Sequence, residues 1–275
     1  MRDERQFIGK IAPALLTALA LIGVTAAAAS AHEGPRAASA RIFDGKAFDT
    51  CEAPSRGAMR AWAQSSPYRA VGIYVGGVNR ACKTQPNLTR GWIRDTARMG
   101  WHHLPLYVGS QAPCIATPHH RIGSEPRALG RREGRDAVDR AAALGIATHS
   151  PLYLDVEAYD IGDRACARAT LSFVRAWNRE VRSHGYIPGF YSSSGSGVAA
   201  MERARLAGVT DLPTVMWFAR WGTPPALAAE PALRAEAWRH RLHQYAGDVR
   251  ESHGGVTLTI DRNVVRAPVA VFAGG

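Results

Sequence analysis

The chain alternates short apolar segments with longer segments of helical periodicity, and this alternation constrains its fold more than any other feature. The apolar segments are rich in aliphatic and aromatic residues, which favours strands. We expect strands at 46–50, 70–75, 103–108, 151–156, 187–191, 214–219, 241–246 and 256–263. We expect helices at 55–64, 88–99, 132–144, 163–184, 197–204 and 225–238.

Strands that alternate with helices favour parallel βαβ units. Eight such strands in a chain of 275 residues predict an α/β fold, a modified (β/α)8 TIM-type barrel, formed by a single domain over residues 43–270. A doubly wound open sheet is the alternative. It is disfavoured because no Gly-rich G-x-G-x-x-G turn follows the first expected strand.

The N-terminus has the pattern of a secretory signal peptide. Arg2, Arg5 and Lys10 precede an apolar run at 11–24, and Ala29-Ser30-Ala31 is an A-x-A-like cleavage site. We therefore expect a signal peptide at 1–31, a flexible leader at 32–42, and a mature protein that is secreted or associated with the cell wall. The general export route is favoured because no Arg-Arg pair precedes the apolar run. A retained anchor is the alternative, but we expect no stable membrane insertion after cleavage.

The formal net charge is +11, and arginine supplies most of the positive groups. Such a charge favours anionic partners such as wall polymers, phospholipid surfaces or nucleic acid. No nucleic-acid-binding signature is present, and export argues against that partner. The alternative is that the arginines only keep the protein soluble.

The sequence contains four cysteines, and all of them follow the expected cleavage site. An even number in an exported chain predicts two disulfides and no free thiol. Three pairings are possible. We favour Cys82–Cys114, because these residues follow neighbouring expected strands, and this choice leaves Cys51–Cys166. No C-x-x-C or His/Cys spacing indicates zinc.

Two acids end the fourth expected strand, which begins Leu152-Tyr153-Leu154. Side chains two positions apart on a strand leave the same face, about 7 Å apart, so Asp155 and Glu157 can reach one substrate. The C-terminal ends of parallel barrel strands are also where TIM barrels hold their active sites. The alternative is an exposed strand end whose acids are only solvated.

Acids, aromatic residues and an amide end several other expected strands. Aromatic faces beside carboxylates suit a sugar, whose C–H face packs on rings while its hydroxyls need acceptors. These strand ends are Phe48-Asp49, Gly189-Phe190-Tyr191-Ser192, Trp217-Phe218-Ala219-Arg220-Trp221, His243-Gln244-Tyr245 and Ile260-Asp261-Arg262-Asn263.

Together with Leu154-Asp155-Val156-Glu157, these motifs resemble those of the family 25 glycoside hydrolases, the lysozyme-type muramidases. Residues 43–265 resemble more closely an exported actinobacterial glycoside-hydrolase-like domain related to that family. Two further stretches carry this second resemblance, Gly72-Ile73-Tyr74-Val75-Gly76-Gly77 and Tyr107-Val108-Gly109-Ser110-Gln111. The chain departs from the muramidases at His243, where they usually carry tryptophan.

The resemblance implies a modified TIM barrel, a carbohydrate ligand and a set of site residues. Glu157 would be the general acid, and Asp155 would either raise the pKa of Glu157 or orient the substrate's acetamido group. The residues expected to bind the substrate around them are Asp49, Asp261, Tyr191, Trp217 and Gln244.

Two functions remain open at this point. One is a glycosidase that acts on a cell-wall amino-sugar polymer, and the other is a weak or inactive carbohydrate-binding or wall-remodelling module on the same barrel. The expected partner is a cell-wall polysaccharide or an anionic wall polymer, and we expect a monomer without cofactor or metal. A metal site at His119-His120 is disfavoured, because adjacent side chains on an extended segment point apart.

Overall fold

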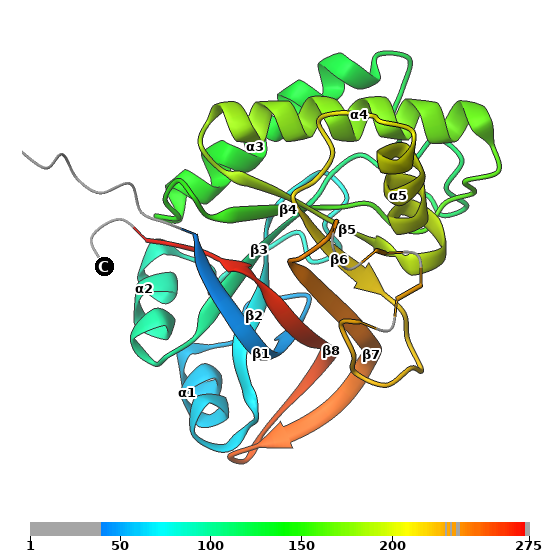
Figure 1. Cartoon of the computed structure of the whole chain (residues 1–275). Helices are drawn as coiled ribbons and strands as arrows, with labels where there is room; N and C mark the ends of the chain where they lie inside the picture. Colours follow the sequence, from blue (N-terminus) through cyan, green and yellow to red (C-terminus); the bar gives the residue numbers. More distant parts are fainter. Residues whose placement is uncertain (1–39, 229, 232, 235–236, 273–275) are drawn as a thin grey trace, which may run out of the picture. The chain divides into compact units, whose positions relative to one another are not determined.

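A computed structural model describes residues 40–272 except 229, 232 and 235–236. Here eight strands close into a barrel in sequence order (Figure 1), so the expected α/β barrel is confirmed. The strands are β1 (Arg41–Asp49), β2 (Tyr68–Gly76), β3 (His102–Val108), β4 (Pro151–Asp155), β5 (Ile187–Ser193), β6 (Val215–Ala219), β7 (Arg241–His253) and β8 (Val256–Val269). The signal peptide expected at 1–31 lies outside the described residues.

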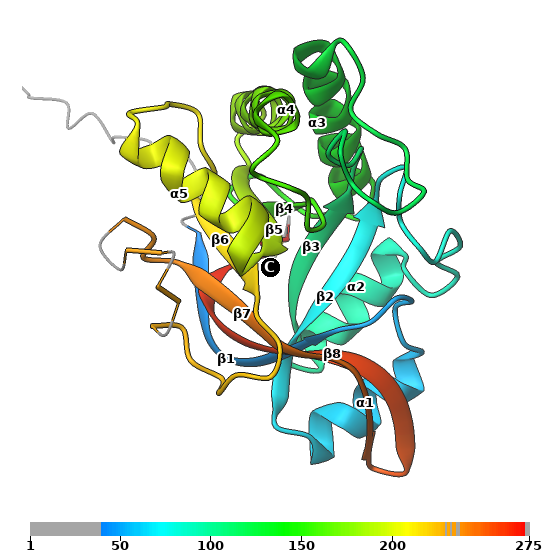
Figure 2. The ribbon, with the colours of Figure 1, turned by 90° about the vertical axis from the view of Figure 1, so that its right-hand side faces the viewer.

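Helices connect the first six strands on the outside of the barrel. They are α1 (Arg56–Ser65), α2 (Arg90–Arg98), α3 (Pro126–Ala143), α4 (Arg164–Ser183), the short π-helical turn η1 (Ser194–Val198) and α5 (Ala199–Leu206). Figures 1 and 2 show α3 and α4 side by side. Gly130 allows this close packing, because a Cβ there would lie 2.4 Å from the carbonyl oxygen of Phe173 on α4.

The barrel is not built from eight parallel units. Strands β1 to β7 pair in parallel, but β8 runs antiparallel to both β7 and β1. A two-residue turn joins β7 to β8, and its glycines, Gly254 and Gly255, have φ of 56° and 75°. Glycine adopts such positive φ angles without a steric penalty, so this sequence favours a tight hairpin and leaves no helix between the last two strands.

Several elements differ from those expected. Strand β1 begins at Arg41, within the segment expected as a leader, because Arg41 pairs with Val269 of the reversed strand β8. Helix α3 begins at Pro126 instead of residue 132, in line with the preference for proline in the first helical turn. The described residues between β6 and β7 contain no helix, so the helix expected at 225–238 is not found there.

Side-chain caps mark the starts of α2 and α4. Asp163 accepts hydrogen bonds from the backbone nitrogens of Ala165 and Cys166 and so caps α4. Thr89 caps α2 in the same way, through Trp92 N. Asn87, just ahead of the helix expected at 88–99, does not cap it and instead donates to the carbonyl oxygen of Ala53.

The core has two parts, one between the barrel and its helices and one inside the barrel. Inside, the large rings of Tyr153 and Trp217 pack edge to face, with their centroids 5.3 Å apart. Gly189 makes room for them, since a Cβ there would lie 2.4 Å from the Tyr153 ring. The barrel interior is therefore filled with side chains, as in other TIM barrels.

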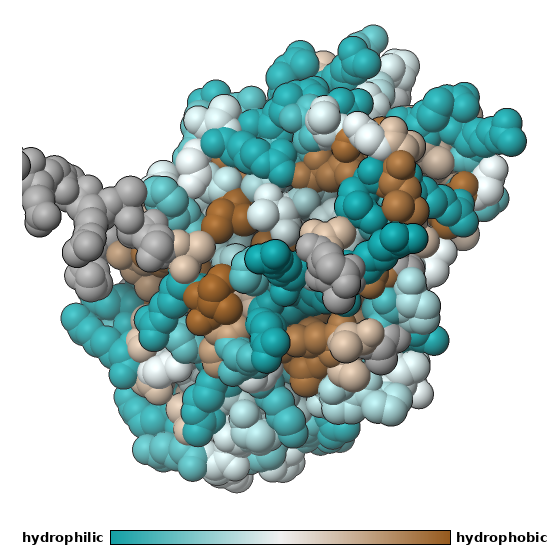
Figure 3. Space-filling model, in the orientation of Figure 1, coloured by the Kyte–Doolittle hydropathy of each residue, from teal (hydrophilic) through white to brown (hydrophobic). Residues whose placement is uncertain are grey.

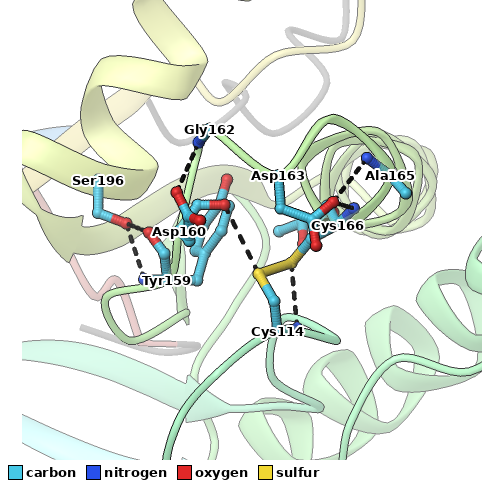
Figure 4. Close-up of a disulfide and its surroundings, with 9 residues drawn as sticks. Cys114, Tyr159, Asp160, Gly162, Asp163, Ala165, Cys166 and Ser196 are labelled. Carbon is cyan, nitrogen blue, oxygen red and sulfur yellow. Dashed lines mark hydrogen bonds between the residues drawn. A yellow bond between two sulfur atoms is a disulfide. The ribbon is translucent and has the colours of Figure 1, made fainter.

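Two disulfides are present, as expected, but the expected pairing is wrong. The bonds join Cys51 to Cys82 and Cys114 to Cys166, the latter shown in Figure 4. Each bond links the segments that follow neighbouring strands, β1 with β2 and β3 with β4. Cys82 follows β2, which lies between β1 and β3 in the barrel. Adjacency of strands therefore allows Cys82 to pair with either Cys51 or Cys114. The expected pairing also required a Cys51–Cys166 bond, which would join the segments after β1 and β4. These strands are three positions apart, so strand adjacency considered for both bonds disfavours that pairing.

The surface in the orientation of Figure 3 is mostly hydrophilic, with scattered hydrophobic patches. Among the described residues, no helix combines the length and the apolar character needed to cross a bilayer.

Candidate active site

Strand β4 places two acids at one end of the barrel in very different environments. Asp155 is the last residue of the strand and is 4% exposed. Its Oδ1 is buried and accepts no hydrogen bond from the described part of the chain. Glu157 lies two residues beyond the strand end and is exposed. The pair therefore combines one buried and one accessible carboxyl group.

Gln111 holds the backbone between these two acids. Its Nε2 donates to the carbonyl oxygen of Asp155 at 3.0 Å and to that of Gly109 at 3.1 Å. Its Oε1 accepts from the backbone nitrogen of Glu157 at 2.7 Å. The side chain is fully buried, so it replaces the strand pairing that β4 loses at its end. Gln111 thereby fixes the segment that carries Glu157.

Asp49, the last residue of β1, is 1% exposed and accepts several hydrogen bonds. Tyr74 Oη and Asn263 Nδ2 each donate to it at 2.8 Å, and Gln244 Nε2 donates at 3.2 Å. Because both carboxylate oxygens are engaged, Asp49 is held rigidly on the wall of the site.

Asp261 faces Asp49 across the pairing of β8 with β1. Gln244 Nε2 donates to Asp261 at 3.2 Å and so contacts both acids, while the backbone nitrogen of Asp248 donates to the other oxygen at 2.8 Å. Asp261 lies within β8 rather than at a parallel strand end. It reaches this rim because the β7–β8 hairpin extends past the barrel before β8 returns through it.

The aromatic residues divide into one that is buried in the barrel and two that border the site. Trp217 has no exposed surface, and its Nε1 donates to Asn263 Oδ1 at 2.8 Å. Its ring lines neither cavity described below, so the expected contact with a sugar is not offered by this geometry. Tyr191 is 9% exposed and donates to Gln244 Oε1. Trp221 is 54% exposed and donates to the same oxygen, which places its ring at the rim.

Two cavities meet at Glu157. The first has a volume of about 350 Å³ and contains Asp49, Asp155, Glu157, Asp248 and Asp261, beside Tyr74 and His119. The second also has a volume of about 350 Å³ and is lined by Glu157, Tyr191 and Trp221 with Ser193, Ser194, Ala219 and Arg220. The four expected acids Asp49, Asp155, Glu157 and Asp261 therefore converge on one cavity.

Burial and mutual repulsion shift these acids toward their neutral forms. Burial raises the pKa of Asp155 well above its ordinary value, and the charges of Glu157 and Asp49 add to this effect. Glu157 keeps an exposed surface, but the cavity walls displace water from its carboxyl group and so raise its pKa, against a smaller lowering by His119. The pKa of Asp261 rises to about 7 through burial and the proximity of Asp49. At neutral pH the cluster therefore holds protons that isolated carboxyl groups would release.

The sequence alone did not single out Gln111, Tyr74, Asn263 or Trp221 as site residues. All four lie within motifs quoted above, but their site roles depend on long-range contacts. Gln111, for example, holds Glu157 through a hydrogen bond across 46 residues. Among the described residues, no group of three or more His, Cys, Asp and Glu side chains has the arrangement of a metal site.

A closed eight-stranded barrel with acids gathered at one rim is the arrangement in which TIM-barrel proteins hold their functional sites. Residues 60–265 match the model of the family described as the Rv2525c-like, glycoside hydrolase-like domain, and the chain belongs to that family. The comparison with curated proteins returned no match.

Solved structures with the same fold share little sequence with this chain. The Tat-secreted protein Rv2525c of Mycobacterium tuberculosis, in complex with L-tartrate, is 19% identical with a TM-score of 0.55, over 82% of this chain and 97% of that one. An uncharacterised protein from B. stearothermophilus is 22% identical with a TM-score of 0.52, over 80% and 95%. The modular autolysin LytC from Streptococcus pneumoniae is 13% identical with a TM-score of 0.52, over 81% of this chain and 47% of that one.

Proposed function

We propose that this protein is an exported glycosidase that cleaves an amino-sugar polymer of the cell wall, with Glu157 as the general acid. The observation that carries the proposal is the position of Glu157. Its side chain is accessible at the junction of two cavities, while the cavity walls displace water from its carboxyl group and raise its pKa. A general acid works best when its pKa lies near the operating pH.

Sugars on both sides of the scissile bond would occupy the two cavities. Trp221 offers an exposed ring on one side, on which the C–H face of a sugar can pack. Asp49, Asp261 and Gln244 offer a polar wall on the other side for the sugar hydroxyls. The proton of Glu157 would pass to the glycosidic oxygen as the bond to the anomeric carbon breaks.

Asp155 would assist through the substrate's acetamido group. Its Oδ1 is buried and accepts no hydrogen bond from the described residues, so it can accept one from an acetamido N–H. That bond favours the ionised carboxylate and positions the acetamido oxygen for attack on the anomeric carbon. Asp49 is less suited to attack, because three side chains already donate to it and it is 1% exposed.

The choice of a wall polymer is supported by the family and by one protein that shares the fold. The family is described as glycoside hydrolase-like, and LytC, which shares the fold, is an autolysin. The two disulfides agree with an exported protein.

The test is release of new reducing ends from peptidoglycan and from chitin-type oligomers. We expect Glu157→Gln to lower the rate by about 10²–10⁴-fold, because glutamine keeps the size of the side chain but cannot deliver a proton. Glu125→Gln is the matched control, since Glu125 is exposed and lines neither cavity. Circular dichroism verifies folding. Equal cleavage by wild type and Glu157→Gln would refute the assignment.

A carbohydrate-binding module is the second candidate. It is favoured by the burial of Asp49 and Asp155, which leaves Glu157 as the one open acid of these three. Wild-type protein that retains glycan but releases no reducing ends would establish this alternative.

A further inference from the structure

A basic hollow borders the acidic cavity. It has a volume of about 680 Å³, and its polar lining consists of Asn79, Arg80, Lys83, His119, His120 and Arg121. The acidic cavity shares Asn79, Arg80 and His119 with it. A ligand in the acidic cavity could therefore extend into the basic hollow without leaving the protein surface.

The positive charges of this hollow are not neutralised by neighbouring acids. None of the described residues that line it is acidic. Lys83 Nζ donates to the carbonyl oxygen of Val78 at 2.8 Å. Among the described residues, the Arg121 guanidinium donates only to the carbonyl oxygen of Thr117, at 3.5 Å. In the described part of the chain neither side chain forms a salt bridge, whereas many other arginines do. Both cations therefore keep their capacity to bind an anion.

The wall of the hollow is held in place by hydrogen bonds. Asn79 Nδ2 donates to the carbonyl oxygens of Gly109 and His120 at 2.8 Å, and its Oδ1 accepts from His120 N at 2.8 Å. Arg121 forms an isolated β-bridge with Gln111, the residue that holds the segment of Glu157. The basic hollow is thus tied to the acidic site through one buried side chain.

We propose that this hollow binds an anionic substituent, a phosphate or a carboxylate, on the sugar polymer that occupies the acidic cavity. The inference rests on the proposed function, because it names the class of polymer that the same site prefers. Lys83 and Arg121 supply charge-assisted hydrogen bonds to the oxyanion. No acid lines the described part of the hollow, whereas five acids line the neighbouring cavity, so an anionic substituent is better accommodated in the hollow.

The experiment measures binding with Glu157→Gln protein, so that any cleavage does not interfere. Calorimetric titrations compare a chitin-type tetramer, the same tetramer with a 6-phosphate, and the same tetramer with a carboxylate-bearing lactyl ether. We expect at least one anionic tetramer to bind about tenfold tighter than the plain one, and this preference to shrink with added salt.

The double variant Lys83→Gln/Arg121→Gln should bind the anionic and plain tetramers about equally, so that the tenfold preference disappears. The matched control is Arg60→Gln/Arg98→Gln, which removes the same charge from exposed positions on α1 and α2 and should keep the preference. If both double variants lose the preference for the anionic tetramer equally, the net charge of the protein explains the preference, and the proposal is overturned. If the Glu157→Gln protein with an otherwise unaltered hollow prefers neither anionic tetramer, the proposal is also overturned.

The two anionic tetramers separate the sources of the anion. Preference for the 6-phosphate assigns a phosphorylated polymer, and preference for the lactyl ether assigns a carboxylate-bearing one. Because binding is read without cleavage, a preference without any glycosidase activity refutes only the proposed function. Cleavage by wild type without a preference refutes only this inference.

Discussion

Replacing Gln111 by methionine should destabilise the protein, although the two side chains are similar in length and volume. Methionine cannot form the three hydrogen bonds that Gln111 makes with Gly109, Asp155 and Glu157. All three backbone partners lie around the end of β4, and Gln111 itself is fully buried. The loss therefore falls on backbone groups that water does not readily reach.

The magnitude follows from the number of bonds. A net contribution of about 0.5–1.5 kcal/mol for each hydrogen bond gives about 1.5–4.5 kcal/mol in all. For a domain of this size, 1 kcal/mol shifts the melting temperature by about 2–4 °C, so a loss near 3 kcal/mol predicts a decrease of about 6–12 °C.

Urea unfolding and calorimetry measure this change, and the titration of glycan measures its effect on the site. Gln85→Met is a useful comparison, because Gln85 also hydrogen-bonds across loops but is only partly buried. We expect a smaller loss there. A Gln111→Met protein as stable as wild type, with an unchanged dependence on urea, would show that Gln111 does not hold the site together.

The remaining predictions concern the disulfides, the acids and the exposed ring. Replacing Cys51 and Cys82 by serine opens a loop of 31 residues and should lower the free energy of unfolding by about 4 kcal/mol, measured in urea. Peptide mapping of the wild type should recover Cys51 linked to Cys82, and a different partner for either would contradict this pairing. Any glycan cleavage should fall as pH rises through the raised pKa of Glu157, because only its neutral form donates a proton, and a rate that stays level into alkaline pH would contradict this. Asp155→Asn should stabilise the protein relative to wild type, because the folded wild type must keep a proton on Asp155 that the unfolded chain releases. This difference in the free energy of unfolding should grow by about 1.4 kcal/mol per pH unit as pH rises from about 4 toward the raised pKa of Asp155. Urea unfolding of both proteins at pH 4 and pH 8 tests whether the difference grows with pH. Trp221→Ala should weaken glycan binding by about threefold to tenfold and leave the melting temperature nearly unchanged, since the ring is 54% exposed.

The sequence was sufficient for the features that depend on local pattern. The apolar segments predicted all eight strands in their correct order, because burial between helices and the barrel interior requires such runs. The strand ends also predicted the convergence of Asp49, Asp155 and Glu157, since a residue at the end of a parallel strand necessarily lies at the rim. Asp261 was expected there for the same reason, but it reaches the rim from within the reversed strand β8. The number of disulfides followed from composition.

Only the tertiary structure decided the features that depend on which distant segments meet. The reversal of β8 places Asp261 opposite Asp49, and no periodicity in β8 reveals its direction, because parallel and antiparallel strands share the same alternation of side chains. The cysteine pairing depended on which strands are neighbours for both bonds at once. The burial of Trp217 and the three hydrogen bonds of Gln111 likewise arise from contacts between segments far apart in the chain. The sequence thus determined which residues reach the rim, while the long-range packing of the barrel determined which of them are buried, which are paired and which stay open to a ligand.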